Sequence, residues 1–110
     1  MADEERFGAV RKGLLEFAIL RIISGASVYV ADILSRLSAT PFATQEGTLY
    51  PLLSKLRREE LLDYDWVESD QGPPRKYYKL TSAGHASFAT QKSEWSTFSQ
   101  AVNELLGAGQ

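Results

Sequence analysis

Hydrophobic positions in the first part of the chain recur with the period of an α-helix and predict two amphipathic helices. The first covers about residues 11–24 and stops near Gly25. The second covers about residues 28–39 and repeats hydrophobic positions at i, i+3, i+4 and i+7. Ser27 is a possible N-cap for it, and the Thr-Pro-Phe sequence at 40–42 ends it because proline restricts the residue before it.

A third amphipathic helix is predicted after Thr44, which can act as its N-cap. Its buried face is formed by leucines at helical spacing: Leu49, Leu52, Leu53 and Leu56. Pro51 interrupts this pattern, because proline lacks the N–H that a helix interior requires. Two interpretations stay open: either the helix begins near Thr48, or its first turns are bent.

The hydrophobic period changes from helical to alternating after the third helix. In residues 62–69, Leu62, Tyr64 and Trp66 alternate with Asp63, Asp65 and Val67, which predicts a strand. Residues 70–74, Asp-Gln-Gly-Pro-Pro, have the composition of a turn. Residues 75–81 alternate again, with two side chains expected to face the core and three to face away: Tyr78 and Leu80 inward, Arg75, Tyr77 and Lys79 outward. The two segments predict a β-hairpin.

The last part of the chain, from Thr81 or Ser82 to about residue 107, predicts one long helix. Phe88, Trp95 and Val102 recur every seven residues, and Phe98 and Leu105 repeat the same interval three positions later. Two interleaved heptad series of this kind are typical of a coiled-coil seam. We therefore expect the last helix to carry a coiled-coil-like seam.

These elements predict a mainly α fold with a small β-hairpin. Three short helices followed by a hairpin is the order of a winged helix-turn-helix, which we assign to residues 1–81. Residues 82–110 are assigned as a C-terminal dimerisation helix. In a winged helix-turn-helix the third helix enters the major groove of DNA, and the hairpin, or wing, reaches the backbone or minor groove beside it.

The net charge of the chain says little about DNA binding, but the positions of its basic residues do. The formal net charge is −2 and the pI is about 5.4, which argues against a nonspecific polyanion binder. Basic and aromatic residues nevertheless gather in Gly-Pro-Pro-Arg-Lys-Tyr-Tyr-Lys-Leu-Thr, residues 72–81. A 100° step per residue also places small, polar or cationic residues opposite the leucines of the third helix: Thr44, Gly47, Pro51, Ser54, Lys55 and Arg58, flanked by Thr48 and Tyr50.

This outer face of the third helix contains no acid, so it suits phosphates and base edges. We expect Thr44, Thr48, Ser54, Lys55 and Arg58 to lie in or beside the groove of double-stranded DNA. Tyr50, Arg75 and Lys76 are expected to contact phosphates. A dimer would place two third helices on the half-sites of a palindromic operator about one helical turn apart.

Two sequence blocks also resemble the PadR-like family of bacterial transcriptional regulators. They are Glu-Gly-Thr-Leu-Tyr-Pro-Leu-Leu-Ser-Lys-Leu-Arg-Arg-Glu-Glu-Leu-Leu at 46–62 and Gly-Pro-Pro-Arg-Lys-Tyr-Tyr-Lys-Leu-Thr-Ser-Ala-Gly-His at 72–85, and the resemblance covers about residues 11–106. It implies a homodimeric, usually repressing, DNA-binding protein that a small molecule releases from DNA. Residues 29–33, Tyr-Val-Ala-Asp-Ile, depart from the family's frequent Tyr-Gly-Tyr-Glu-Ile.

The resemblance leaves two interpretations of Trp95. It can pack in the dimer seam, or it can stack on a flat aromatic effector, as its counterpart does in some drug-sensing relatives. Phe88 and Phe98 are candidates to line the same site, with Val102 and Leu105 further along the seam. An alternative function is a winged helix that binds another protein and has no DNA site, which the net negative charge would favour.

The remaining composition excludes other classes of function. Without cysteines and with His85 as its sole histidine, the chain has a poor ligand set for a metal site. No phosphate-binding glycine loop and no nucleophile–base pair is found, so we expect no enzymatic activity and no cofactor. The hydrophobic run at residues 14–23 is short and contains Glu16 and Arg21, so we expect no membrane partner and a cytoplasmic location.

Overall fold

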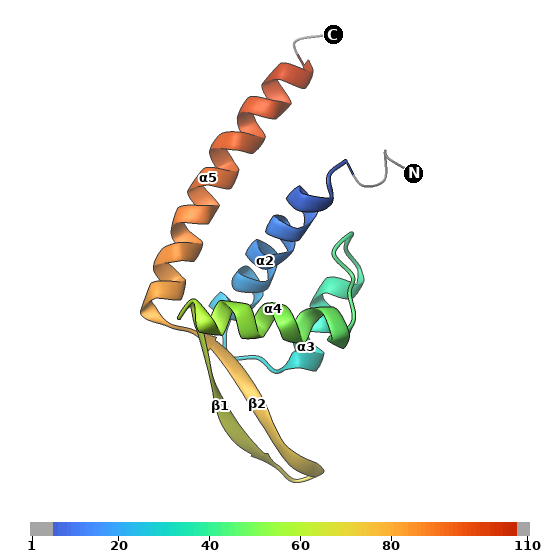
Figure 1. The fold of residues 1–110 in the computed structure, drawn as a ribbon, viewed down its shortest axis with the longest axis vertical. Coiled ribbons are helices and arrows are strands. Elements are labelled where there is room, and N and C mark those ends of the chain that lie inside the picture. Colours follow the sequence, from blue (N-terminus) through green and yellow to red (C-terminus); the bar gives the residue numbers. More distant parts are fainter. Residues whose placement is uncertain (1–5, 108–110) are drawn as a thin grey trace.

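The computed structural model describes residues 6–107 and has the predicted order of elements (Figure 1). Within these residues lie four helices and one hairpin: α2 (Gly8–Gly25), α3 (Val30–Ser38), α4 (Glu46–Arg58), β1 (Leu62–Ser69), β2 (Gly72–Leu80) and α5 (Ser82–Gly107). The prediction of a mainly helical winged fold with a long last helix is confirmed. Helix α2 begins at Gly8, earlier than expected, and residues 1–5 and 108–110 of the two predicted segments lie outside the described residues.

The core lies where α2, α3, α4 and the base of the hairpin meet. The hydrophobic residues predicted to face inward on the three helices supply it, and Ile19, Ile33 and Leu49 are fully buried. Leu62, Tyr78 and Leu80 extend the same cluster onto the hairpin. The four leucines of α4 are all buried, as their spacing predicts.

The N-caps of α3 and α4 differ from the predictions. Tyr29, not Ser27, precedes α3, and its backbone N–H donates to Asp32 Oδ2 at 3.3 Å. Gln45, not Thr44, precedes α4, and no side chain caps that helix. Both predictions were wrong by one or two residues, because caps depend on where tertiary packing starts the helix.

Helix α4 runs through Pro51 as a single element that begins at Glu46. The interpretation that it begins near Thr48 is therefore wrong. Pro51 is exposed. Because proline has no N–H, the carbonyl of Gly47, four positions earlier, lacks its usual helical hydrogen bond.

The end of α4 turns the chain into the hairpin through a Schellman-type cap. The Leu61 N–H donates to the Leu56 carbonyl at 3.0 Å, and the Glu60 N–H donates to the Arg57 carbonyl at 2.9 Å. Glu60 adopts φ = 63° in this cap, a left-handed conformation that glycine usually occupies.

Strands β1 and β2 form a two-stranded antiparallel sheet, which we call the wing. Leu62 pairs with Leu80 at its base, and Trp66 pairs with Lys76 further out, before an irregularity between Val67 and Ser69. Val28 anchors the base through backbone hydrogen bonds of 3.1 and 2.7 Å with Tyr78. The outer half of the wing extends away from the helices (Figure 1).

Helix α5 starts on a cap that the sequence predicts. Thr81 Oγ1 accepts a hydrogen bond from the Gly84 N–H at 2.9 Å and donates to the Glu60 carbonyl at 2.6 Å. Gly84 is buried, and a Cβ there would lie 2.0 Å from the Leu61 carbonyl oxygen, so only glycine fits. Beyond its first turns α5 lies beside α2 and then projects past it (Figure 1). No helix within residues 6–107 is long and apolar enough to cross a bilayer.

Candidate nucleic-acid interface

The outer side of α4 carries the polar residues that the helical projection predicts. Thr48, Ser54 and Arg58 are exposed, and Tyr50 keeps 44% of its surface exposed. Thr44 lies just before the helix and is half-buried. One acidic residue was missed: Glu46, in the first turn of α4, lines the groove between this helix and the wing.

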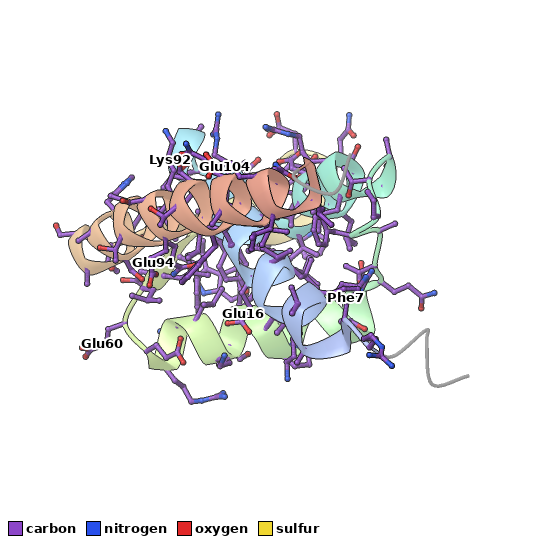
Figure 2. All side chains as sticks on the ribbon, turned by 90° about the horizontal axis from the view of Figure 1, so that it is seen from above. Phe7, Glu16, Glu60, Lys92, Glu94 and Glu104 are labelled. Atoms are coloured by element: carbon purple, nitrogen blue, oxygen red, sulfur yellow. The ribbon has the colours of Figure 1, made fainter. Side chains whose placement is uncertain are left out.

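Lys55 is half-exposed, and its ammonium group is turned toward α2. Its Nζ donates to both carboxylate oxygens of Glu16 on α2, at 2.9 and 3.1 Å, and lies 3.9 Å from Glu59. The hydrogen bond to Glu16 is the main cause that raises the pKa of Lys55 above its ordinary value. Figure 2 shows Glu16 between α2 and α4. Lys55 therefore joins two helices, a role that a projection of one helix cannot reveal.

The cations of the wing lie against aromatic rings. The Arg75 guanidinium lies 4.9 Å from the centre of the Tyr29 ring, and Tyr29 in turn packs on Tyr77 at 5.3 Å. Lys76 Nζ lies 4.5 Å from the Tyr64 ring and 5.4 Å from the Trp66 ring. Successive strand residues point in opposite directions, and the two cations accordingly stack on different rings.

Two grooves separate the wing from the helices. The wing groove, of about 540 Å³, lies between the wing and the first residues of α3 and α4: Tyr29, Val30, Ala31, Glu46, Tyr50, Trp66, Pro74, Arg75 and Lys76 line it. The α4 groove, of about 780 Å³, lies along the second half of α4 and includes Ser54, Arg57, Arg58, Tyr64 and Lys76. Lys76 lines both grooves, and we call the two grooves together the concave surface.

Arg57 is a cation of this surface that the sequence patterns did not identify. Its guanidinium lies 4.5 Å from the Tyr64 ring, and its Nε lies 3.8 Å from Asp63 Oδ1. Arg57, Arg58, Arg75 and Lys76 thus surround a surface that also carries hydroxyl groups. Phosphates bind such a set of cations and hydroxyls.

A third, apolar groove of about 400 Å³ lies between α2 and α5. Leu14, Phe17, Phe42, Phe88 and Trp95 line it, and the Phe17 and Phe88 rings are 5.6 Å apart. Phe88 and Trp95 are thus brought together as expected. Phe98, Val102 and Leu105 lie further along α5 and are exposed, outside this groove.

Comparisons with known proteins agree with this architecture. The family model described as "Transcriptional regulator PadR-like family" matches residues 19–90. A PadR-like transcription factor of Bacteroides fragilis is 42% identical, with a TM-score of 0.78 over 89% of this chain and 95% of that one. A PadR-like transcriptional regulator of Bacillus cereus is 38% identical, with a TM-score of 0.79 over 86% and 93% of the two chains. An uncharacterized protein of Lysinibacillus sphaericus is 28% identical over 86% of this chain and 90% of its own length.

The matched residues 19–90 extend from the middle of α2 to the first turns of α5 and contain α4, the wing and both grooves between them. The family and the fold are therefore supported by the same part of the molecule that carries the cationic surface. The chain belongs to the PadR-like family of transcriptional regulators.

Proposed function

We propose that the protein is a sequence-specific DNA-binding regulator that works as a homodimeric repressor in the cytoplasm. The observation that supports this most directly is the concave surface between α4 and the wing, with Arg57, Arg58, Arg75 and Lys76 around it. A duplex carries phosphates on both sides of its major groove, so a helix flanked by a cationic wing matches that charge pattern.

In this arrangement α4 enters the major groove with its outer side. Thr48, Ser54 and Arg58 face base edges and nearby phosphates, while Thr44 lies beside the groove. The Tyr50 hydroxyl and the two wing cations, Arg75 and Lys76, hold phosphates. Lys55 supports α4 through Glu16 instead of contacting DNA.

The free side of α5 supports a dimer. Trp95, Phe98, Val102 and Leu105 are exposed by 46, 64, 52 and 76% in the single chain, and they repeat at coiled-coil spacing. A row of large apolar side chains on a projecting helix is stabilised when a second copy covers it. A two-fold dimer then presents two α4 helices to a palindrome with half-sites about one helical turn apart.

The apolar groove between α2 and α5 is the proposed effector site. Phe17, Phe88 and Trp95 offer ring faces on which a flat aromatic compound can stack. A compound bound there contacts the helix that joins the two copies, so it can change the spacing of the two α4 helices. Linkage requires that an effector that lowers DNA affinity is itself bound less tightly by the DNA complex.

The function is tested by fluorescence anisotropy on a duplex from upstream of the protein's own gene, over a salt series and against scrambled DNA. We expect preference for the upstream duplex and affinity that falls steeply with salt. Absence of binding at low salt by a folded dimer would instead support the protein-interaction alternative. For the effector, quenching of tryptophan emission by planar aromatic compounds should be lost in Trp95→Ala, in which Trp66 remains as the reporter.

A further inference from the structure

Trp66 is an exposed aromatic residue whose position packing does not explain. It lies on the outer half of β1 and keeps 62% of its surface exposed, although its strand neighbours Leu62 and Tyr64 on the same face are buried and half-buried. Its aromatic contact is an edge-on arrangement with Tyr64, with the ring centres 5.9 Å apart. Much of the indole is therefore available to a partner.

The ring faces the same surface that we propose for DNA. Trp66 lines the wing groove together with Tyr50 of α4 and Arg75 of β2. A duplex held by α4 and by the wing cations, as proposed above, would pass along this groove. The inference below rests on the proposed DNA-binding function and adds a residue to it.

Lys76, directly opposite Trp66 in the sheet, supplies the charge that accompanies this ring. Its Nζ lies 5.4 Å from the indole centre and 4.5 Å from the Tyr64 ring. No carboxylate within residues 6–107 lies within ion-pair distance of it, whereas the neighbouring Lys79 is neutralised by Asp65 at 2.9 Å. The ring and an uncompensated cation are thus presented side by side.

We propose that Trp66 contacts DNA from the wing, with its indole packed on the sugar edge of the backbone and with Lys76 on the adjacent phosphate. Deoxyribose offers an apolar edge and phosphate an anion at neighbouring positions, which matches a ring beside an ammonium group. A protein partner with a negatively charged surface would also meet these groups, but the hydroxyls and cations of α4 on the same concave surface favour the duplex.

The contributions of Lys76 and Trp66 to DNA affinity should differ in how they depend on salt concentration. Lys76 releases counterions when it neutralises a phosphate, so Lys76→Ala should lower the slope of log affinity against log salt by about one. Trp66 removes apolar surface from water and releases no ions, so Trp66→Ala should weaken binding about ten-fold at every salt concentration, with the slope unchanged. Both losses should be similar on upstream and scrambled DNA.

Val67 provides a matched control. It is the next residue of β1, is 41% exposed, and points to the opposite face of the wing. Val67→Ala should change affinity less than about two-fold, because Val67 is not among the residues that line the wing groove. A loss in Val67→Ala as large as that in Trp66→Ala would show that the wing had been destabilised, and it would overturn the assignment.

A second measurement uses the native Trp66 and does not depend on a wing variant that folds. The chain contains two tryptophans, so Trp95→Phe leaves Trp66 as the sole indole, and Trp66→Phe leaves Trp95. Quenching by acrylamide, a neutral molecule, reports how accessible each indole is. We expect saturating DNA to lower the quenching constant of Trp66 by about half, and that of Trp95 hardly at all.

Unchanged quenching of Trp66 in a saturated DNA complex, or wild-type affinity in Trp66→Ala, would overturn the proposal while the DNA-binding function remained. Failure of the wild-type protein to bind any duplex at low salt would remove both. The two failures are distinguished by the anisotropy of the unmodified protein, which is measured first.

Discussion

Lys55 Nζ lies 2.9 Å from Glu16 Oε1 and joins α4 to α2 across 39 positions of sequence. Glu16 is largely shielded from solvent, since its side chain is 17% exposed. The ion pair therefore links two helices of the domain. It also means that the charge of Lys55 is already neutralised within the protein.

We therefore expect Glu16→Gln and Lys55→Gln each to lower the melting temperature modestly, and the double variant to be no less stable than either one. Each single variant already removes the ion pair, so the second substitution removes no further interaction. The double-mutant cycle therefore measures the interaction energy between the two side chains. Differential scanning fluorimetry at low and high salt measures it, and the effect should shrink with salt. Additive losses would show that the two side chains act independently.

The same contact predicts the DNA behaviour of Lys55. Lys55→Gln should leave the salt slope of DNA binding unchanged, whereas Arg58→Ala should lower it by about one, because Arg58 is exposed on the outer side of α4. Anisotropy over a salt series compares the two. A reduced slope in Lys55→Gln would mean that Lys55 leaves Glu16 when DNA binds.

The wing cations should act on all sequences alike. Arg75→Ala combined with Lys76→Ala is expected to weaken binding to upstream and scrambled duplexes and to lower the salt slope by up to about two. Lys12→Ala, an exposed cation of α2 away from the wing, is the matched control and should leave the slope unchanged. An unchanged slope in the double variant would remove the wing from the DNA site.

Gly84 should be the least replaceable glycine of the chain. Gly84→Ala places a methyl group 2.0 Å from the Leu61 carbonyl oxygen, so the start of α5 must move away from the α4–β1 connection. We expect a loss of about 3 kcal/mol or more in the free energy of unfolding, measured by urea titration. Gly13→Ala is the control: its Cβ meets nothing within 4 Å in the middle of α2, so it should stabilise by about 0.5–1 kcal/mol.

Glu60 holds a left-handed conformation, with φ = 63°, that favours glycine. Glu60→Gly should raise the free energy of unfolding by about 0.5 kcal/mol, because relief of backbone strain exceeds the added entropy of the unfolded chain. Glu59→Gly, at the preceding residue with φ = −80°, should be destabilising. Equal effects at both positions would contradict the backbone explanation.

Stability should fall at alkaline pH. Burial is the main cause that raises the pKa of Tyr78 above its ordinary value of 10.0, and the hydrogen bond to Asp65 is the main cause that raises the pKa of Lys79 above 10.5. Above these ordinary values the folded protein binds more protons than the unfolded chain, so stability is lost as pH rises. Urea titrations from pH 7 to 11 should show this loss, and Tyr78→Phe should make it shallower. An equally steep loss in Tyr78→Phe would exclude a contribution from this phenol.

Local sequence patterns were sufficient to predict the helices, the hairpin and most of the buried core residues. The leucine spacing of α4 and the alternation around Tyr78 and Leu80 depend on residues close in sequence, and the helical or strand period alone selects their buried faces. The heptads of α5 are also a local pattern, but their large apolar side chains are exposed in the single chain. The cap formed by Thr81 follows from the same local chemistry. The family could be identified from two sequence blocks for the same reason.

Tertiary structure decided which of the predicted site residues are available. The helical projection places Lys55 on the outer face of α4, but in the folded chain its ammonium group donates a hydrogen bond to Glu16 on α2. Trp66 continues an inward alternation, yet the wing extends beyond the helices, so no core remains to cover the ring. Glu46 and Arg57 join the concave surface because residues of the wing line the same grooves as they do. Periodicity reports which side of an element a residue occupies, whereas what lies on that side depends on contacts between residues far apart in the chain.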